Sequence, residues 1–326
     1  MNPYLLGLIF VIPKQTMQDE IFNRIIEALQ VKYYRAALRE IVKPVELNGS
    51  IEPRNILVQV NTGFCYGERD FRRINPGDFY FMPVGSPIYF RHGKSAKYSV
   101  FGKEGFNSPQ QREQFVKSRS VFKDENESKD TFSIMGFDVN IYGAIPFFSI
   151  LELPCFILNS NQKLNDLMRE IIVEDESDNI GRTRLLKNLS EELVVHLCRF
   201  IHDKPEFREN YNKISYLLDK RLVNIIQYIQ ASLSEDLSNQ KIADQAFVSK
   251  DYVGQFFKSL TNTNLQDYIE NQRLERANYL LRTTKDNIQE IAHQVGFKDP
   301  AYFSRRFKNK YNINANQVRK DKIIAI

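Results

Sequence analysis

Residues 242–258 read IADQAFVSKDYVGQFFK, and residues 291–308 read IAHQVGFKDPAYFSRRFK. Both stretches carry one pattern: an Ile-Ala pair, a turn, and a second segment that ends in aromatic residues followed by lysine. A side chain that can accept hydrogen bonds from free backbone N–H groups precedes each second segment, Ser249 in the first copy and Asp299 in the second. Gly296 supplies the turn of the second copy. The pattern predicts two helix-turn-helix units, each with a short helix followed by a capped second helix.

The segment between the two copies is suited to hold them apart. Residues 265–282 (LQDYIENQRLERANYLLR) contain no glycine or proline and carry apolar residues at helical spacing. They predict one helix of about 18 residues, which is roughly 27 Å long. Successive major grooves on one face of DNA lie roughly 34 Å apart, so each second helix could enter one of them. The spacing predicts that one chain covers about two turns of duplex.

These residues resemble the C-terminal DNA-binding domain of the AraC/XylS family of transcription regulators. The resemblance covers residues 220–322 and includes both repeated stretches together with R273-L274-x-x-A277-x-x-L280-L281 between them. It implies a sequence-specific transcription regulator whose main partner is double-stranded DNA. The resemblance also implies a small-molecule effector, a homodimer and contact with RNA polymerase.

Five positions depart from the family pattern. Phe247 stands where the first turn often carries glycine, and Asn262 and Asn312 replace the glycine expected after each second helix. Asparagine also tolerates the left-handed backbone that ends many helices. Ala315 and Val318 replace a usual proline and an aromatic residue. These departures bear on local stability more than on the resemblance itself.

The DNA-binding candidates lie on or beside the two second helices: Ser249, Lys250, Asp251, Gln255, Lys258, Ser304, Arg305, Arg306, Lys308 and Lys310. Arg305 can donate twice to guanine and Gln255 can pair similarly with adenine, so we expect these two to read bases. Arg306, Lys308 and Lys310 are expected to contact phosphates. The alternative is that Arg305 also only holds phosphate, as many protein–DNA hydrogen bonds do.

Charge is distributed unevenly along the chain. From residue 220 onward there are 17 Lys and Arg against 11 Asp and Glu, a balance of +6, whereas the preceding 219 residues hold 28 against 29, a balance of −1. Such a surface can serve solubility alone. Together with the repeat, it favours contact with phosphates.

The N-terminal part has a β-rich pattern. Short apolar runs at 56–60, 79–82, 88–90 and 98–101 are separated by turns rich in Gly and Pro, which is typical of an antiparallel barrel or jelly roll. The stretch Gly77-x(5)-Pro83-x-Gly85-x-x-Ile88 resembles a motif of the cupins, whose small barrels serve as sensor domains in this regulator family. The expected fold class is therefore α+β, with an N-terminal cupin-like barrel and an all-α C-terminal domain.

Metal and catalytic sites are not expected. A metal-binding cupin would carry histidine at the position of Ile88, and isoleucine cannot ligate a metal. His92 is expected on the surface or hydrogen-bonded in the core. The sequence lacks a Gly-rich phosphate loop, Cys-x-x-Cys, His-Glu-x-x-His and Gly-x-Ser-x-Gly, so we expect no enzyme and no cofactor. Two alternatives to a ligand-responsive regulator stay open. One is a regulator whose barrel is purely structural and binds no effector, and the other is a cupin enzyme fused to a DNA-binding module.

Aromatic side chains are the ligand candidates of the barrel, namely Tyr66, Phe81, Tyr89 and Phe90. They could line its mouth, although alternate residues of any barrel simply form its core.

Two amphipathic segments follow the barrel, at residues 162–175 and 183–202. Family resemblance makes the leucine stripe of the second one a dimer candidate, through Leu186, Leu189, Leu193 and Leu197. The alternative is that both helices pack on their own barrel.

The expected organisation has five parts. Residues 1–40 form an N-terminal extension with a helix, 41–155 the barrel, 156–202 a helical dimerisation segment, 203–219 a linker, and 220–322 the DNA-binding domain.

A cytoplasmic location without membrane association is expected. The apolar run at 4–12 is too short to span a bilayer, and it has neither a preceding basic segment nor a following cleavage site. Three cysteines among apolar neighbours indicate reduced core residues.

Overall fold

The computed structural model describes residues 14–318 apart from 64, 94, 96, 103–105, 107–108, 122–129, 144, 208–209, 211–213 and 312. The apolar run at 4–12 and Asn312 lie outside the described residues. The chain divides into two compact units, the first comprising residues 1–141 and 146–214 and the second residues 142–145 and 215–326. The division falls within the segment 203–219 that was predicted as a linker.

The strands of the described chain are β1 (Leu29–Ile41), β2 (Val45–Ile51), β3 (Asn55–Thr62), β4 (Cys65–Gly67), β5 (Arg72–Ile74), β6 (Phe79–Met82), β7 (Pro87–His92), β8 (Ser99–Phe101), β9 (Val116–Arg119), β10 (Thr131–Ile141), β11 (Ile145–Pro146) and β12 (Phe156–Leu158).

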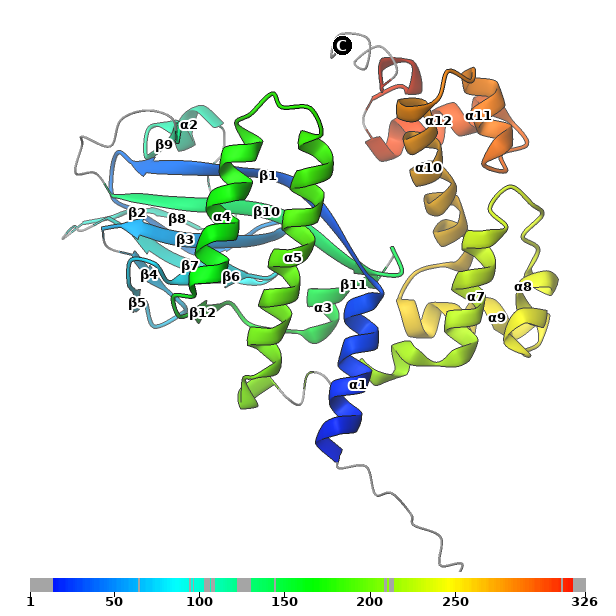
Figure 1. The fold of residues 1–326 in the computed structure, drawn as a ribbon, viewed down its shortest axis with the longest axis horizontal. Coiled ribbons are helices and arrows are strands. Elements are labelled where there is room, and N and C mark those ends of the chain that lie inside the picture. Colours follow the sequence, from blue (N-terminus) through cyan, green and yellow to red (C-terminus); the bar gives the residue numbers. More distant parts are fainter. Residues whose placement is uncertain are drawn as a thin grey trace, which may run out of the picture. The chain divides into compact units, whose positions relative to one another are not determined.

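These strands form two sheets (Figure 1). The larger has the order β12-β6-β3-β10-β1-β9, with β11 beside β10, and the smaller has the order β5-β4-β7-β2-β8. Along these two strand orders, consecutive strands pair antiparallel except β2 and β8, which are parallel. Val58 and Phe132 of the larger sheet share one apolar core with Val45 and Phe90 of the smaller. The β-rich N-terminal region is confirmed, and its core lies between the two sheets.

Strand β1 corrects the expected domain boundary at residue 41. Residues 29–40 are not part of a helical extension, because α1 (Lys14–Glu27) ends before them and β1 pairs with β10 from Leu29↔Ile141 to Glu40↔Thr131. The segment RAALRE at 35–40 favours helix by intrinsic propensity. Pairing with β10 on one side and β9 on the other outweighs that preference.

The helices of the first unit are α1, α2 (Pro109–Glu113), α3 (Phe147–Leu151), α4 (Gln162–Asp175), α5 (Arg182–His202) and the short η1 (Pro205–Phe207). Helices α4 and α5 lie side by side along the larger sheet, where both contact β1 (Figure 1). The predicted helices at 162–175 and 183–202 therefore agree closely with α4 and α5.

The leucine stripe of α5 faces its own unit. Leu186, Leu189, Leu193 and Leu197 are 3%, 8%, 0% and 0% exposed. The assignment of these side chains to a dimer contact is therefore corrected, because they already pack in the core of the first unit. Lysine at Leu189 and Leu193 would disrupt that core. A homodimer stays a prediction without assigned contact residues.

The second unit is helical. Its elements are η2 (Ser215–Leu218), α7 (Lys220–Ala231), α8 (Asn239–Ala246), α9 (Lys250–Thr261), α10 (Leu265–Thr283), α11 (Ile288–Gln294) and α12 (Pro300–Tyr311). Helix α10 connects a first helix-turn-helix, α8–α9, to a second, α11–α12 (Figure 1). The predicted connector and the all-α C-terminal domain are confirmed.

Within the described part of the chain, no helix has the length and apolar character needed to cross a membrane. Cys65, Cys155 and Cys198 are free thiols, as expected, and Cys155 is the one that is only partly buried.

Candidate DNA-binding interface and barrel cavity

Helices α9 and α12 present the same pattern of buried residues. Both are 12 residues long, and in each two aromatic or apolar side chains four positions apart are fully buried: Val253 and Phe257 in α9, Phe303 and Phe307 in α12. Positions four apart lie on one face of a helix. These buried pairs fix which residues of each helix point away from the domain.

The outward face of each helix lies opposite its buried pair. Asp251, Gln255 and Lys258 are exposed on α9, and Ala301, Arg305 and Lys308 are exposed at the corresponding positions of α12. Of the other candidates, Ser249, Lys250 and Ser304 are also exposed. The Ser304 hydroxyl donates to the carbonyl of Pro300 at 2.9 Å.

The turns before the two helices begin alike and then diverge. The N–H of Val248 donates to the carbonyl of Ala243 at 3.2 Å, and the N–H of Phe297 donates to that of Ala292 at 2.9 Å. Asp299 then caps α12, since its Oδ1 accepts from the N–H of Ala301 at 2.8 Å. Ser249 occupies the capping position of α9, but its side chain makes no capping hydrogen bond. The predicted cap is thus present only in the second copy.

Arg273 on α10 joins the two halves of the domain. Its Nε donates to the carbonyl of Leu233 and its Nη2 to that of Glu235, each at 2.9 Å. Gly296 packs directly against this hydrogen bond between Arg273 and Leu233. A Cβ added at Gly296 would be 2.4 Å from the Leu233 oxygen and 2.8 Å from Arg273 Nε. Arg273 belongs to the quoted sequence pattern, but no sequence signal assigned it this structural role.

Two departures from the family pattern occupy left-handed backbone. Phe247 has φ 53° and Asn262 has φ 52°, each at the end of a helix. Asparagine adopts this conformation at low cost, whereas phenylalanine does not. Ala315 and Val318, which replace a proline and an aromatic residue, are buried in the core of the second half.

Two predicted phosphate contacts are engaged within the domain instead. Arg306 forms an ion pair with Glu270 of α10, which also accepts from the Tyr302 hydroxyl at 2.6 Å. Lys310 pairs with Glu275 at 3.0 Å and donates to the carbonyl of Asn271 at 3.1 Å. The expectation for Arg306 and Lys310 is corrected, because both side chains hold α12 against α10. Lys308 is exposed on the outward face.

We expect Lys308→Gln to reduce the slope of log K against log salt concentration by about one unit, because DNA binding then releases one counterion fewer. Lys310→Gln is the matched control on the same helix and should leave the slope unchanged. The slopes come from binding titrations at several salt concentrations. Equal slopes for the wild type and Lys308→Gln would remove Lys308 from the phosphate contacts.

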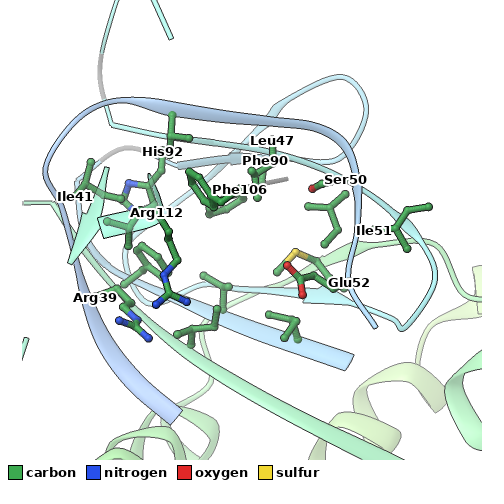
Figure 2. Close-up of a pocket in the computed structure, with 18 of the residues that line it drawn as sticks. Arg39, Ile41, Leu47, Ser50, Ile51, Glu52, Phe90, His92, Phe106 and Arg112 are labelled. Carbon is green, nitrogen blue, oxygen red and sulfur yellow. The ribbon is translucent and has the colours of Figure 1, made fainter. Parts of the chain in front are cut away.

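A cavity of about 500 Å³ lies in the first unit. Its wall is formed by side chains from both sheets and from α2: Arg35, Arg39, Ile41, Val45, Leu47, Ser50, Ile51, Glu52, Pro53, Ile56, Val58, Met82, Ile88, Phe90, His92, Phe106, Arg112, Val116, Phe132 and Ile134. Figure 2 shows Arg39 and Arg112 on one side of this cavity and Glu52 on the other.

One of the four predicted ligand aromatics lines the cavity. Phe90 does so, whereas Phe81 is fully buried against Phe148 and other aromatic rings away from it. Tyr89 lines a different pocket, and Tyr66 is absent from the cavity wall. The expectation for these three residues is corrected. Successive side chains of a strand face opposite sides, so Met82 reaches the cavity while its neighbour Phe81 does not.

His92 differs from both environments expected for it. The side chain is fully buried in the cavity wall, and neither ring nitrogen has a hydrogen-bond partner among the described residues. Burial lowers the pKa of His92 to about 3, so the ring is neutral at ordinary pH. In the described ranges, no group of three or more His, Cys, Asp or Glu side chains is arranged to hold a metal ion.

Comparison with known proteins identifies the helical unit. Residues 242–321 match a family model described as a helix-turn-helix domain. The chain carries an AraC-type helix-turn-helix domain. The HTH-type transcriptional regulator MtrA from Neisseria gonorrhoeae is 24% identical over 166 residues, which make up 51% of this chain and 55% of the relative. The Msm operon regulatory protein from Streptococcus mutans is 32% identical over 117 residues, covering 36% and 42% of the two chains.

The matches thus span about half the length of these relatives, which are named as a transcriptional regulator and an operon regulatory protein. Among solved structures, an AraC-type regulator from Chromobacterium violaceum matches 31% of this chain and 91% of its own, at 29% identity and a TM-score of 0.30. Apo ToxT K231A from Vibrio cholerae matches 89% of this chain and 96% of its own, at 13% identity and a TM-score of 0.36.

Proposed function

We propose that this chain is a sequence-specific transcription regulator that reads DNA with α9 and α12 and responds to a small molecule in the cavity of its first unit. The observation that carries the DNA-binding part is the matched pair of outward faces on α9 and α12. Each face is held by buried aromatic residues and by contacts to the same helix, α10. One chain therefore offers two helices to one duplex.

The two faces differ in the chemistry they offer to base edges. Arg305 can donate to both acceptors of a guanine, and Gln255 can pair with an adenine through one donor and one acceptor. Asp251 can accept from the amino group of a cytosine, whereas Ala301 offers only a methyl contact. Arg305 is exposed, and its Cζ atom lies 5.9 Å from the centre of the Tyr302 ring. Among the described residues Arg305 forms no ion pair, so its guanidinium is available to DNA. We infer that Arg305 and Gln255 are the main base readers.

Arg305→Ala should weaken binding to the preferred duplex by roughly 1–3 kcal/mol and relax preference at one base position. Arg276→Ala, an exposed arginine on α10, is the matched control and should change neither quantity. Binding is measured on a set of duplexes in which each base of the selected site is varied. A uniform loss across all duplexes would make Arg305 a phosphate contact and leave Gln255 as the main reader.

The second part of the proposal rests on the cavity. Its volume falls within the roughly 300–1,000 Å³ that is usual for small-molecule sites. A barrel with only a structural role would be filled by its own side chains. Contact with RNA polymerase and homodimerisation stay predictions.

A further inference from the structure

We propose that the cavity of the first unit binds an organic carboxylate with an apolar body, and that Arg39 and Arg112 hold its carboxylate group. This proposal deepens the effector response proposed above by giving the chemical class of the ligand and the residues that recognise it. It rests on positive charge and polar atoms that have no partner among the described residues, and on the apolar remainder of the cavity wall.

The positive charge of Arg39 is buried and has no acidic partner in the part of the chain that the structure describes. Arg39 on β1 is only 8% exposed, and its guanidinium donates to the hydroxyl of Ser118. Among the described residues, no carboxylate forms an ion pair with Arg39 or with Arg112. Burial, followed by the charges of Arg112 and Arg35, lowers the pKa of Arg39 to about 10. Arg39 therefore stays charged at neutral pH, beside a second guanidinium.

Among the described residues, the nearby acids form no ion pair with Arg39 or Arg112, although the charge of Arg112 acts on Glu52. Glu52 lies across the cavity from Arg39 and Arg112 (Figure 2). Burial raises the pKa of Glu52, and the charge of Arg35 is the strongest of the effects that oppose it. Glu113 on α2, whose charge opposes the lowering of the Arg39 pKa, is exposed. A bound anion between Arg39 and Arg112 would supply the missing charge.

Several buried polar atoms of the wall also lack partners. His92 Nδ1, His92 Nε2, Arg112 Nε and Ser50 Oγ have no hydrogen-bond partner within the described part of the chain. Buried polar groups without partners are rare in folded proteins, and each calls for an explanation, such as a bound molecule or ion that supplies the partner. Neutral His92 can donate one hydrogen bond, and Arg112 Nε another. Both lie on the same wall as Arg39, so the donors converge where the positive charge is greatest.

The rest of the wall defines the body of the ligand. Ile88, Phe90, Phe132 and Met82 are buried aliphatic or aromatic residues that line the same cavity. A polyhydroxylated ligand would leave its hydroxyl groups unpaired against these side chains. Inorganic phosphate would satisfy the guanidinium groups but leave the apolar part of the cavity unfilled. An apolar body carrying one carboxylate fits both parts.

The first experiment measures thermal unfolding of the purified chain of 326 residues in the presence of matched probes. Octanoate and 3-phenylpropanoate are compared with their primary amides and with inorganic phosphate. At least one carboxylate should raise the unfolding temperature, while its amide and phosphate should not. Equal effects of a carboxylate and its amide would overturn the role of charge, and an equal effect of phosphate would overturn the apolar body. No effect of either carboxylate would overturn the proposal.

The second experiment removes the charge. Arg39→Met and Arg112→Met should each weaken carboxylate binding at least about tenfold, because hydrogen bonds to charged groups are lost. The free Arg39→Met protein should unfold at the same or a higher temperature than wild type, since a buried unpaired charge is removed. Arg72→Met on β5, whose side chain is 64% exposed, is the matched control and should bind normally. Wild-type affinity in Arg39→Met would contradict the proposal.

These outcomes are independent of DNA binding. Ligand binding is measured without DNA, and the base preference of α12 is measured without ligand. Loss of DNA binding would refute the proposed regulator and leave the assignment of the cavity standing, whereas failure of the carboxylates would refute that assignment alone.

Discussion

Phe257→Ala should destabilise the helical unit by about 3–5 kcal/mol, because it removes a fully buried ring from a close-packed core. The ring of Phe257 packs against that of Tyr268 on α10, with centroids 5.2 Å apart. Its loss should therefore free α9 from α10 and abolish DNA binding. Hydrogen exchange of the α9 amides measures the free energy of local opening.

Phe247→Ala is the matched control in the same helix-turn-helix. Phe247 is 90% exposed, so its ring contributes little to the core. Replacement by alanine should change the free energy of unfolding by less than about 0.5 kcal/mol. A large loss of stability in Phe247→Ala, or a small one in Phe257→Ala, would contradict the assignment of Phe257 to the core and of Phe247 to the surface.

Gly296→Ala should destabilise the unit by roughly 2–6 kcal/mol, since backbone strain and overpacking each cost about 1–3 kcal/mol. Gly296 has φ 92°, and the added Cβ would lie 2.4 Å from the carbonyl oxygen of Leu233. Relief would require the loop held by Arg273 to move. The change should therefore appear as faster hydrogen exchange both in α11–α12 and in residues 232–238.

Gly254→Ala is the opposite case. Gly254 lies inside α9, and a Cβ there would meet no atom within 4 Å. Alanine should stabilise the helix by about 0.5–1 kcal/mol, since it loses less backbone entropy on folding. Destabilisation by Gly254→Ala, or tolerance of Gly296→Ala, would contradict this account of the two glycines.

The helical unit could be predicted from sequence because its pattern is local. Helix periodicity and capping residues act over fewer than about 20 residues, and each copy of the repeat (242–258 and 291–308) is equally short. The connector and both helix-turn-helix motifs were therefore predicted near their observed bounds. The roles of Arg306 and Lys310 could not be predicted in this way. Their partners Glu270 and Glu275 lie on another helix, and a basic residue on an amphipathic helix looks the same with or without such a partner.

The first unit was predicted only in outline because its pairing is non-local. Strand β1 has residues that favour helix, and its partner β10 lies about a hundred positions later in the chain. Once β1 was missed, Arg39 could not be placed in the cavity wall. The sequence of β1 gives little warning, because its buried residues Val31, Ala36 and Arg39 do not follow a two-residue alternation. Phe81 was misplaced because a shift of one residue along a strand reverses the face.

Footprinting of the full chain on its preferred duplex, selected from random sequences, tests the central claim most directly. Two protected segments are expected on one face of the DNA, with centres roughly 34 Å apart, because α9 and α12 enter successive major grooves. Gln255→Ala should weaken base preference in one segment and Arg305→Ala in the other. A single protected segment, or loss of preference in both segments from either change, would contradict reading by two helices of one chain.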